Sequence, residues 1–287
     1  MSDAESTLTT RPQAPYAPLD AGFVQALPAA FEDVVAGVRR HRSWRYLAVE
    51  HVKNSYRRTV IGPWWLTAQS LLYVIGLGFV FSRINGRPLK EFLPFVAVGY
   101  LTFLLLSGLV RAGGQVFVSQ AGVLKSTRQP LSSLVLRAVA IEGIQFGHNV
   151  LIVGVLLAVR LIDPSWWLAA APLALAVILL NGVAVALWLG PMVARFRDVA
   201  PAVDSLLQVL VFLTPVFYPS SIFRGSEHWV VAWNPFGYFV DLFRSFVLGG
   251  RPGLTTVVGA GVFTLANLLL AAVVFTRTRS RLPYWVA

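Results

Sequence analysis

The sequence predicts an all-α integral membrane protein with six transmembrane helices, an N-terminal amphipathic interface helix and a short re-entrant pair of outer gate helices. Hydrophobic residues make up 56% of its 287 residues and charged residues only 13%, which lies outside the range of ordinary soluble domains. Apolar stretches of roughly 20 residues, the length that crosses a bilayer, follow one another from residue 64 onward. The chain therefore divides into an arm (1–28), an interface helix region (29–63) and a six-span domain (64–287).

The arm over residues 1–28 is rich in Pro, Ala and Thr and contains no apolar core of the length that a signal peptide requires. We expect it to be disordered and cytoplasmic, and we expect the spans themselves to direct the chain to the membrane. Between Ala29 and Arg58 apolar residues such as Phe31, Val34 and Val38 recur at helical spacing beside many arginines. Such a helix is typical of the membrane interface, and packing on a partner protein is the alternative.

The segment YRRTVIGPWW, from Tyr56 to Trp65, marks the boundary between the basic region and the first span. Pro63 donates no backbone hydrogen bond and disfavours a helical Gly62, so one helix is expected to end here and another to begin at Trp64. Arginines on one side and tryptophans on the other are typical of a cytoplasmic membrane surface.

Six apolar stretches define the expected spans, and the basic residues around them predict the orientation. Fifteen Lys or Arg residues fall in the segments that would be inside and seven in those that would be outside. The positive-inside rule then places both termini in the cytoplasm of a multi-pass protein of the cell (inner or plasma) membrane. The predicted spans are Trp64–Ser82, Phe92–Val110, Leu134–Val159, Trp167–Ala194, Val199–Tyr218 and Leu254–Thr276.

The link between the fifth and sixth spans, at about residues 220–250, is too apolar for an ordinary loop and too interrupted for a span. Asn234 and Pro235 are typical of a helix N-cap and first helical residue, and Gly249 and Gly250 of a helix end. Asp241 and Arg244, three residues apart, can pair on one face. We expect re-entrant or surface-lying helices on the outer side, covered by protein.

Signatures of catalysis are missing from the sequence. None of the three lysines follows a glycine, so there is no phosphate-binding P-loop, and the chain is not expected to hydrolyse ATP alone. The four histidines lack metal-ligand spacing, no GxSxG occurs and there is no cysteine. We therefore predict no catalytic residue, no metal site and no cofactor in this chain. The net charge of +11 flanks apolar runs, which indicates anionic lipids as partners and no nucleic acid.

Two carboxylates fall inside predicted spans. Glu142 shares a helix face with Gln145 and Asn149, and Asp204 begins a similar stripe. Intramembrane carboxylates are costly, so a proton relay or a polar conduit is one interpretation. The other is structural: the acids pair with residues such as Arg137, or they cap neighbouring helices.

Aromatic residues are frequent in the first and fifth spans. Their flat faces suit sugar rings, whose C–H groups are apolar, although lipid-facing belts are an alternative interpretation. One face of the first span is less hydrophobic than the rest and is expected to face a lumen. The residues predicted to line a substrate channel are Trp65, Gln69, Tyr73, Gln208, Phe212, Phe217 and Tyr218.

The boundary segment resembles the start of the membrane subunit of type-2 ABC exporters that carry lipid-linked polysaccharides, namely O-antigen, teichoic acid or actinobacterial galactan. Further segments are similar to that family in the same order: GVLKSTRQPLS, ARFRDVAP, LTPVFYP, WNPFGYFVDLFRSFVLG and RLPYWV. The resemblance runs from about Phe31 to the end. The excess of Arg over Lys in a chain rich in Ala, Val and Gly favours a galactan carrier.

The resemblance implies a homodimer with two copies of a separate ATPase subunit, which binds the ATP and Mg. The first and fifth spans of both copies would line a channel for a lipid-linked glycan. A type-2 exporter of drugs or lipids, a membrane-embedded glycan polymerase or transferase, and a scaffold are the alternatives. The resemblance assigns ATPase coupling to Gly122, Lys125, Arg128, Arg195 and Asp198, the lipid-carrier entrance to Tyr56, Arg57 and Arg58, and the outer gate to Asn234, Pro235, Asp241 and Arg244. Headgroup anchoring is the alternative role for the entrance arginines.

Overall fold

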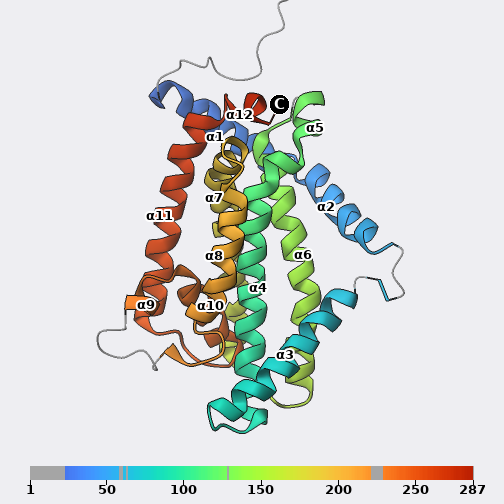
Figure 1. The fold of residues 1–287 in the computed structure, drawn as a ribbon, viewed down its shortest axis with the longest axis vertical. Helices are drawn as coiled ribbons and strands as arrows, with labels where there is room; N and C mark the ends of the chain where they lie inside the picture. Colours follow the sequence, from blue (N-terminus) through green and yellow to red (C-terminus); the bar gives the residue numbers. More distant parts are fainter. Residues whose placement is uncertain (1–22, 58–60, 63, 128, 221–228, 287) are drawn as a thin grey trace, which may run out of the picture.

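The computed structural model describes residues 23–57, 61–62, 64–127, 129–220 and 229–286. All regular structure within these ranges is helical (Figure 1), which confirms the predicted all-α class. Five helices are long and apolar enough to cross a membrane. They are α3 (Trp64–Ile84), α4 (Leu89–Ser119), α6 (Leu131–Ala158), α7 (Ala171–Arg195) and α11 (Leu254–Thr278). The short 3-10 helix η1 (Trp166–Ala170) leads directly into α7.

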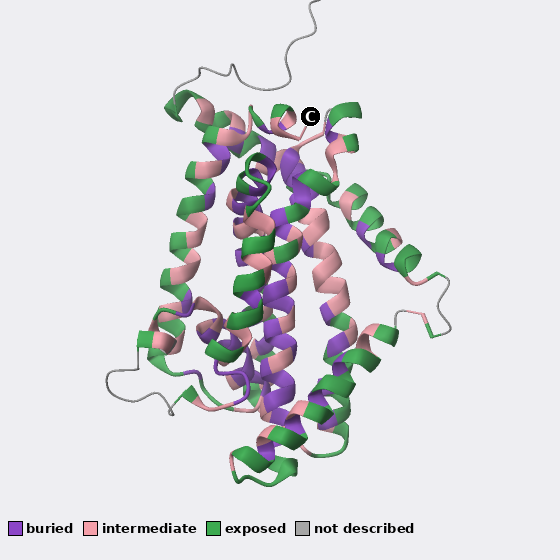
Figure 2. Ribbon diagram, viewed as in Figure 1, coloured by how far each residue is buried: buried purple, intermediate pink, exposed green. Residues whose placement is uncertain are grey.

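Helix α4 is the centre of the bundle. It packs against α3, α6, α7 and α10 (Pro235–Val247), and Figure 2 shows buried residues concentrated along it. Glycines let α4 and α7 approach closely: a Cβ on Gly190 would lie 2.9 Å from the ring of Phe117 and 3.0 Å from the carbonyl oxygen of Gly113. Small residues at helix contacts are the usual way to bring membrane helices together, because lipid provides no hydrophobic driving force between them.

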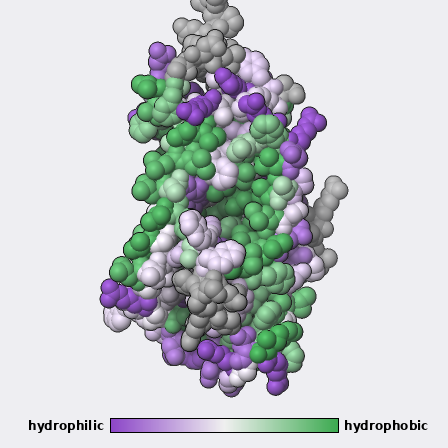
Figure 3. Space-filling model, turned by 60° about the vertical axis from the view of Figure 1, so that its left-hand side comes forward, coloured by the Kyte–Doolittle hydropathy of each residue, from purple (hydrophilic) through white to green (hydrophobic). Residues whose placement is uncertain are grey.

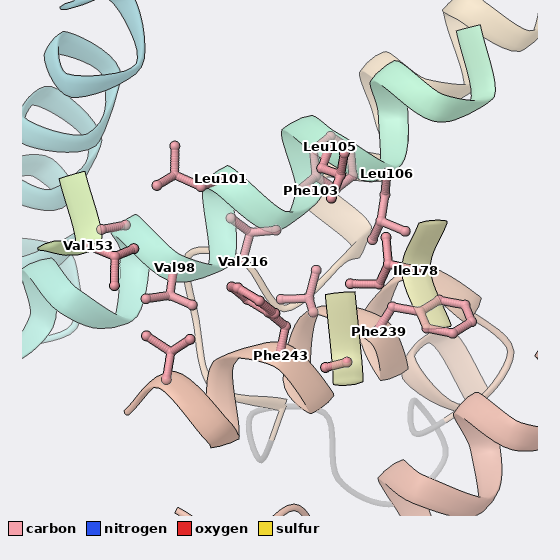
Figure 4. Packing of buried hydrophobic residues seen from close by; sticks show 14 of the residues in the cluster. Val98, Leu101, Phe103, Leu105, Leu106, Val153, Ile178, Val216, Phe239 and Phe243 are labelled. Atoms are coloured by element: carbon pink, nitrogen blue, oxygen red, sulfur yellow. The ribbon is translucent and has the colours of Figure 1, made fainter. Parts of the chain in front are cut away.

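The larger hydrophobic cluster joins α4 to α6, α7 and α10. In Figure 4, Leu106 of α4 lies beside Ile178 of α7 and Phe239 of α10, and Val216 lies beside Phe243 of α10. A second cluster lies at the other end of the bundle and includes residues of α1 (Phe23–Arg39), α5 (Ala121–Ser126) and α12 (Leu282–Trp285). The two clusters fix the long helices at both ends.

The predicted fifth span is shorter than expected. Helix α8 (Val199–Leu213) has 15 residues and is about 22 Å long, which is less than the hydrocarbon core of about 30 Å. It ends because Pro215 forces the preceding Thr214 into an extended conformation, with φ −86° and ψ 138°. Residues 214–218 of the predicted span are therefore non-helical, and five long helices plus one shorter apolar helix stand where six spans were predicted.

The N-terminal region forms two helices instead of one. Helix α1 begins at Phe23, inside the predicted arm, and α2 (His41–Ser55) follows a break at Arg40. Residues 1–22 lie outside the described residues. Helix α2 packs along α6, whereas α1 contacts both α6 and α11. The predicted break before Trp64 is confirmed: α3 begins at that residue, and Gly62 has a φ of +60°, which glycine adopts without strain.

The predicted caps of the outer segment are confirmed. Asn234 accepts a hydrogen bond from the Phe236 nitrogen at 3.0 Å, and Pro235 is the first residue of α10. Gly249 follows the helix with a φ of +82°. Helix α10 lies among α4, α7, η1 and α11, and the short α9 (Trp229–Ala232) precedes it. Residues 221–228, the remainder of the predicted gate region, are not described.

The surface reflects the expected environment. Figure 3 shows hydrophobic residues over the middle of one face and hydrophilic residues at its two ends. The apolar windows of α3 and α11 are only 22% and 11% buried within the chain. Apolar helices that their own chain leaves uncovered require lipid or another subunit as a covering.

Candidate functional site

A cavity of about 390 Å³ lies between α3, α4 and α6, halfway along the long helices. An ionisable residue at this depth of a membrane span raises a functional hypothesis. The polar and aromatic residues of its lining are Gln69 and Tyr73 from α3, Tyr100 and Arg111 from α4, and Glu142, Gln145 and Asn149 from α6.

Helical periodicity explains how these side chains converge. Glu142, Gln145 and Asn149 are spaced three and four residues apart, so they share one face of α6, and Gln69 and Tyr73 are likewise four apart on α3. From the sequence the two stripes were predicted separately, one as a lumen and the other as a polar conduit. The structure brings both onto one cavity.

Glu142 sits against a glycine and not beside the predicted arginine. A Cβ on Gly108 of α4 would collide with the Glu142 carboxylate. The predicted pairing with Arg137 is wrong: Arg137 donates to Gln120 Oε1 at 3.1 Å, toward the end of α4. Within the described ranges no hydrogen bond or ion pair reaches the Glu142 carboxylate. Its oxygens are available to a ligand in the cavity.

The other intramembrane acid has a partner that sequence reasoning missed. Arg111 Nε donates to Asp204 Oδ1 at 3.0 Å, and both side chains are about half exposed. The pair joins α4 to α8. It was missed because the second span was expected to end at Val110, whereas α4 continues to Ser119. The interpretation of Asp204 as an ion-pairing residue therefore holds, with a different arginine.

Aromatic rings extend from the cavity toward the turn after α8. Tyr73 stacks on Tyr100 with a centroid distance of 5.9 Å, Tyr100 on Phe217 at 6.4 Å, and Phe217 on Phe81 at 4.7 Å. Phe217 is only 3% exposed, so its ring packs inside this chain and does not lie at a free surface.

The other residues predicted for the channel lie closer to the surface. Trp65 and Tyr73 of α3 and Gln208 and Phe212 of α8 are exposed. Tyr218 is partly buried, and its hydroxyl donates to the carbonyl oxygen of Phe212 at 2.6 Å. Exposed side chains on α3 and α8 require a second surface before they can enclose a channel.

The residues predicted for the carrier entrance do not line the cavity within the described part of the chain. Burial raises the pKa of Tyr56 above its ordinary value, and the negative charge of Glu142 acts in the same direction. Tyr56 therefore lies within electrostatic reach of Glu142. Arg57 is exposed beside it, and Arg58 is among the residues that are not described.

The residues predicted to couple to an ATPase gather at the end of the bundle that carries α1, α5 and α12 (Figure 1). Gly122 and Lys125 are exposed on α5, and Arg128 lies outside the described residues. The guanidinium of Arg195 lies 5.3 Å from the ring centroid of Trp285 in α12, and Asp198 is exposed nearby in the chain.

The residues predicted for the outer gate are hydrogen-bonded to the turn after α8. Arg244 donates to the carbonyl oxygen of Pro215 at 2.6 Å and to Asp241 at 2.7 Å, as predicted for the pair, and lies 3.9 Å from the centroid of the Phe95 ring. Burial raises the pKa of Asp241, while the charge of Arg244 acts against that increase. The amide of Asn234 donates to the carbonyl oxygen of Leu213 at 3.2 Å.

A buried carboxylate that sequence reasoning missed connects three helices at the end of the bundle where α1 lies. Asp33 of α1 accepts hydrogen bonds from the backbone nitrogens of Leu131 and Ser132, at 3.1 and 2.9 Å, and from Arg279 Nε at 3.2 Å. The first two nitrogens belong to the first turn of α6, which has no internal partners for them. The available signal was an acidic residue on the apolar face of an amphipathic helix.

These features define a class of protein: a multi-span membrane protein with a polar, aromatic cavity at the middle of its spans. The chain belongs to the ABC-2 type transporter family, whose model matches residues 42–248.

Individual relatives are consistent with this family. The chain is similar to two O-antigen export system permease proteins RfbA of Klebsiella pneumoniae, each 22% identical, over 74% and 69% of this chain and 87% and 77% of the relative. It is also similar to an RfbA of Myxococcus xanthus, at 24% identity over 70% of this chain and 76% of that protein.

Proposed function

We propose that this chain is the transmembrane subunit of an ATP-driven exporter that moves lipid-linked polysaccharide out of the cytoplasm. The observation that carries the proposal is the cavity between α3, α4 and α6, whose polar and aromatic lining lies at mid-span. Each unsatisfied hydroxyl in hydrocarbon costs several kcal/mol, so a glycan requires such surroundings during its crossing. The similarity to O-antigen export permeases supports the same substrate class.

The energy comes from a separate ATPase subunit, which binds ATP and Mg and is present in two copies. The membership of the ABC-2 type transporter family and the lack of a P-loop in the sequence support a separate ATPase. The ATPase docks on the end of the bundle that exposes Gly122 and Lys125 of α5 together with Arg195 and Asp198. Arg128, which lies outside the described residues, is assigned to the same contact from the sequence. By the positive-inside rule this end, with both termini, faces the cytoplasm, and the protein resides in the inner or plasma membrane.

Two copies of the chain form the channel as a homodimer. Apolar and aromatic side chains on α3 and α8, among them Trp65, Tyr73 and Phe212, are about half exposed or more. A second copy would cover these faces and enclose a passage between the two pairs of helices. The glycan is a polysaccharide such as O-antigen or galactan, delivered on its lipid carrier beside Tyr56, Arg57 and Arg58.

Reconstitution into liposomes, with and without the cognate ATPase subunit, tests the proposal. The chain alone should hydrolyse no ATP, and the complex should move lipid-linked glycan across the bilayer only when ATP is present. Robust ATP hydrolysis by the chain alone, or glycan movement without the ATPase, would refute it.

The docking surface has a matched pair of variants. Lys125→Glu changes the exposed charge of α5, whereas Lys90→Glu makes the same change at the start of α4, the opposite end of the bundle. Lys125→Glu should reduce co-purification of the ATPase and Lys90→Glu should leave it unchanged. Equal behaviour of the two variants would place the docking surface elsewhere.

A further inference from the structure

The cavity between α3, α4 and α6 contains a buried acceptor without a partner. Asn149 is 5% exposed, it lines the cavity, and its Oδ1 makes no hydrogen bond within the described part of the chain. Buried polar atoms of native proteins are nearly always paired. At the middle of a membrane span, the partner of such an atom has to come from whatever occupies the cavity. An orphaned acceptor that lines a cavity therefore points to a ligand that donates a hydrogen bond.

The charges around the cavity select the kind of ligand. Arg111 is already paired with Asp204 at 3.0 Å, and Glu142 adds a second carboxylate without a paired cation among the described residues. Two carboxylates beside one guanidinium disfavour an anion, so a lipid diphosphate is a poor occupant. No group of three or more potential metal ligands occurs in the described ranges. A neutral ligand with several hydroxyl groups fits, since each hydroxyl both donates and accepts.

The aromatic side chains of the cavity favour a ligand that has a flat apolar face. Tyr73 is 57% exposed and stacks on Tyr100, and both rings line the cavity. A pyranose presents its apolar C–H groups on one face and its hydroxyls around the rim, which suits a flat ring opposite polar side chains. The volume of about 390 Å³ lies within the usual range for ligand pockets, roughly 300–1,000 Å³.

We propose that this cavity binds a single pyranose unit of the transported glycan. Its hydroxyls donate to Asn149 Oδ1 and the Glu142 carboxylate, the amides of Gln69 and Gln145 bond the remaining hydroxyls, and Tyr73 packs on its C–H face. The proposal rests on the proposed function and deepens it, because it locates sugar recognition inside one chain, between α3, α4 and α6. Gly108 is part of the site, since only a glycine leaves room for the Glu142 carboxylate.

Equilibrium binding to the purified complex of this chain and its ATPase, in nanodiscs without nucleotide, tests the site. The probes are a polyprenyl diphosphate that carries one hexose, taken through a panel of hexoses, and the same lipid without sugar. The wild-type complex should bind at least one sugar-bearing lipid more tightly than the sugar-free lipid. Glu142→Gln and Asn149→Leu should reduce that preference by about tenfold, the size expected for an unpaired buried group, and leave binding of the sugar-free lipid unchanged.

Gln115→Leu is the matched control, since Gln115 is exposed on α4 and lies outside the cavity. It should keep the full sugar preference. Glu142→Gln removes a charge but keeps size and shape, so the test does not depend on Asn149→Leu folding. The proposal is overturned by equal binding of the two lipid types to wild type, by an unchanged preference in Glu142→Gln, or by equal loss of both lipids in the variants.

Failure of the proposed function gives a different result. A wild-type complex that discriminates sugar-bearing from sugar-free lipid but moves neither across the bilayer with ATP supports the site and refutes the exporter. Transport that depends on pH through Glu142, with sugar preference intact in Glu142→Gln, assigns the carboxylate to proton movement and overturns the site.

Discussion

Replacement of Asp33 tests which contacts stabilise the end of the bundle where α1 lies. Its side chain is nearly fully buried and accepts two hydrogen bonds from the first turn of α6 and one from Arg279 at the end of α11. Pro130 precedes that turn and α6 has no side-chain cap of its own. The carboxylate therefore serves as an N-cap supplied by another helix, and it also neutralises a largely buried arginine.

The helix cap and the ion pair together determine how much loss of Asp33 should lower the free energy of unfolding. Loss of an N-cap costs about 0.5–2 kcal/mol, and removal of one partner of a buried ion pair costs about 3–5 kcal/mol. The two overlap in one side chain, so Asp33→Ala should lower the free energy of unfolding by about 3–5 kcal/mol in total. Asp33→Asn keeps an acceptor and loses the charge, and we expect a smaller loss of about 1–3 kcal/mol.

Unfolding of the purified protein in detergent, followed by the fluorescence of its nine tryptophans, measures both variants. Glu32→Ala is the matched control, because Glu32 is the exposed neighbour of Asp33 in the same helix, and it should change stability by less than about 0.5 kcal/mol. A loss below about 1 kcal/mol for Asp33→Ala would refute the reasoning, since removal of one partner of a buried ion pair should cost about 3–5 kcal/mol by itself. A double-mutant cycle with Arg279→Gln should then give a coupling of about 1–3 kcal/mol.

Three further predictions use the same unfolding measurement. Arg244→Leu removes the hydrogen bonds of a buried guanidinium to Pro215 and to the partly buried Asp241 and should cost about 1.5–3 kcal/mol; a neutral result would show that the turn after α8 is held without it. Gly190→Ala forces α4 and α7 apart, because the new Cβ meets an aromatic ring at 2.9 Å, and it should cost about 1–3 kcal/mol of unfolding free energy. The control is Gly261→Ala, which has open space around it and should cost nothing. Asn181→Leu removes the hydrogen bonds between α7 and α11 and should cost about 0.5–2 kcal/mol; an increase in stability would contradict it.

Local backbone chemistry made several boundaries predictable. A proline restricts its own conformation and that of the residue before it, so the start of α3 after Pro63 and the cap of α10 at Asn234 could be identified from a few letters. The same rule applied to Pro215 ends α8, yet the apolar run continues past it. The predicted fifth span was bounded by hydropathy and not by this proline, so it extended to Tyr218, beyond the end of α8 at Leu213.

Tertiary partners could not be predicted in the same way. Asp33 and Arg279 are 246 positions apart, and no local pattern connects them. From hydropathy alone, the second span was expected to end just before Arg111. Helix α4 continues past this arginine because Asp204 of α8 pairs with its charge, and hydropathy cannot show such a partner. The polar stripes of α3 and α6 were visible by periodicity, but only packing shows that they face each other across one cavity.

The shortness of α8 affects how freely its end can move relative to α10. Because the helix is too short to cross, the chain continues through Thr214 and Pro215 as non-helical backbone. Arg244 donates to the carbonyl oxygen of Pro215, and Asn234 donates to the carbonyl oxygen of Leu213 and to the hydroxyl of Thr214. Widening of this turn requires these hydrogen bonds to break, so a displacement of the end of α8 must either break them or move α10 with it.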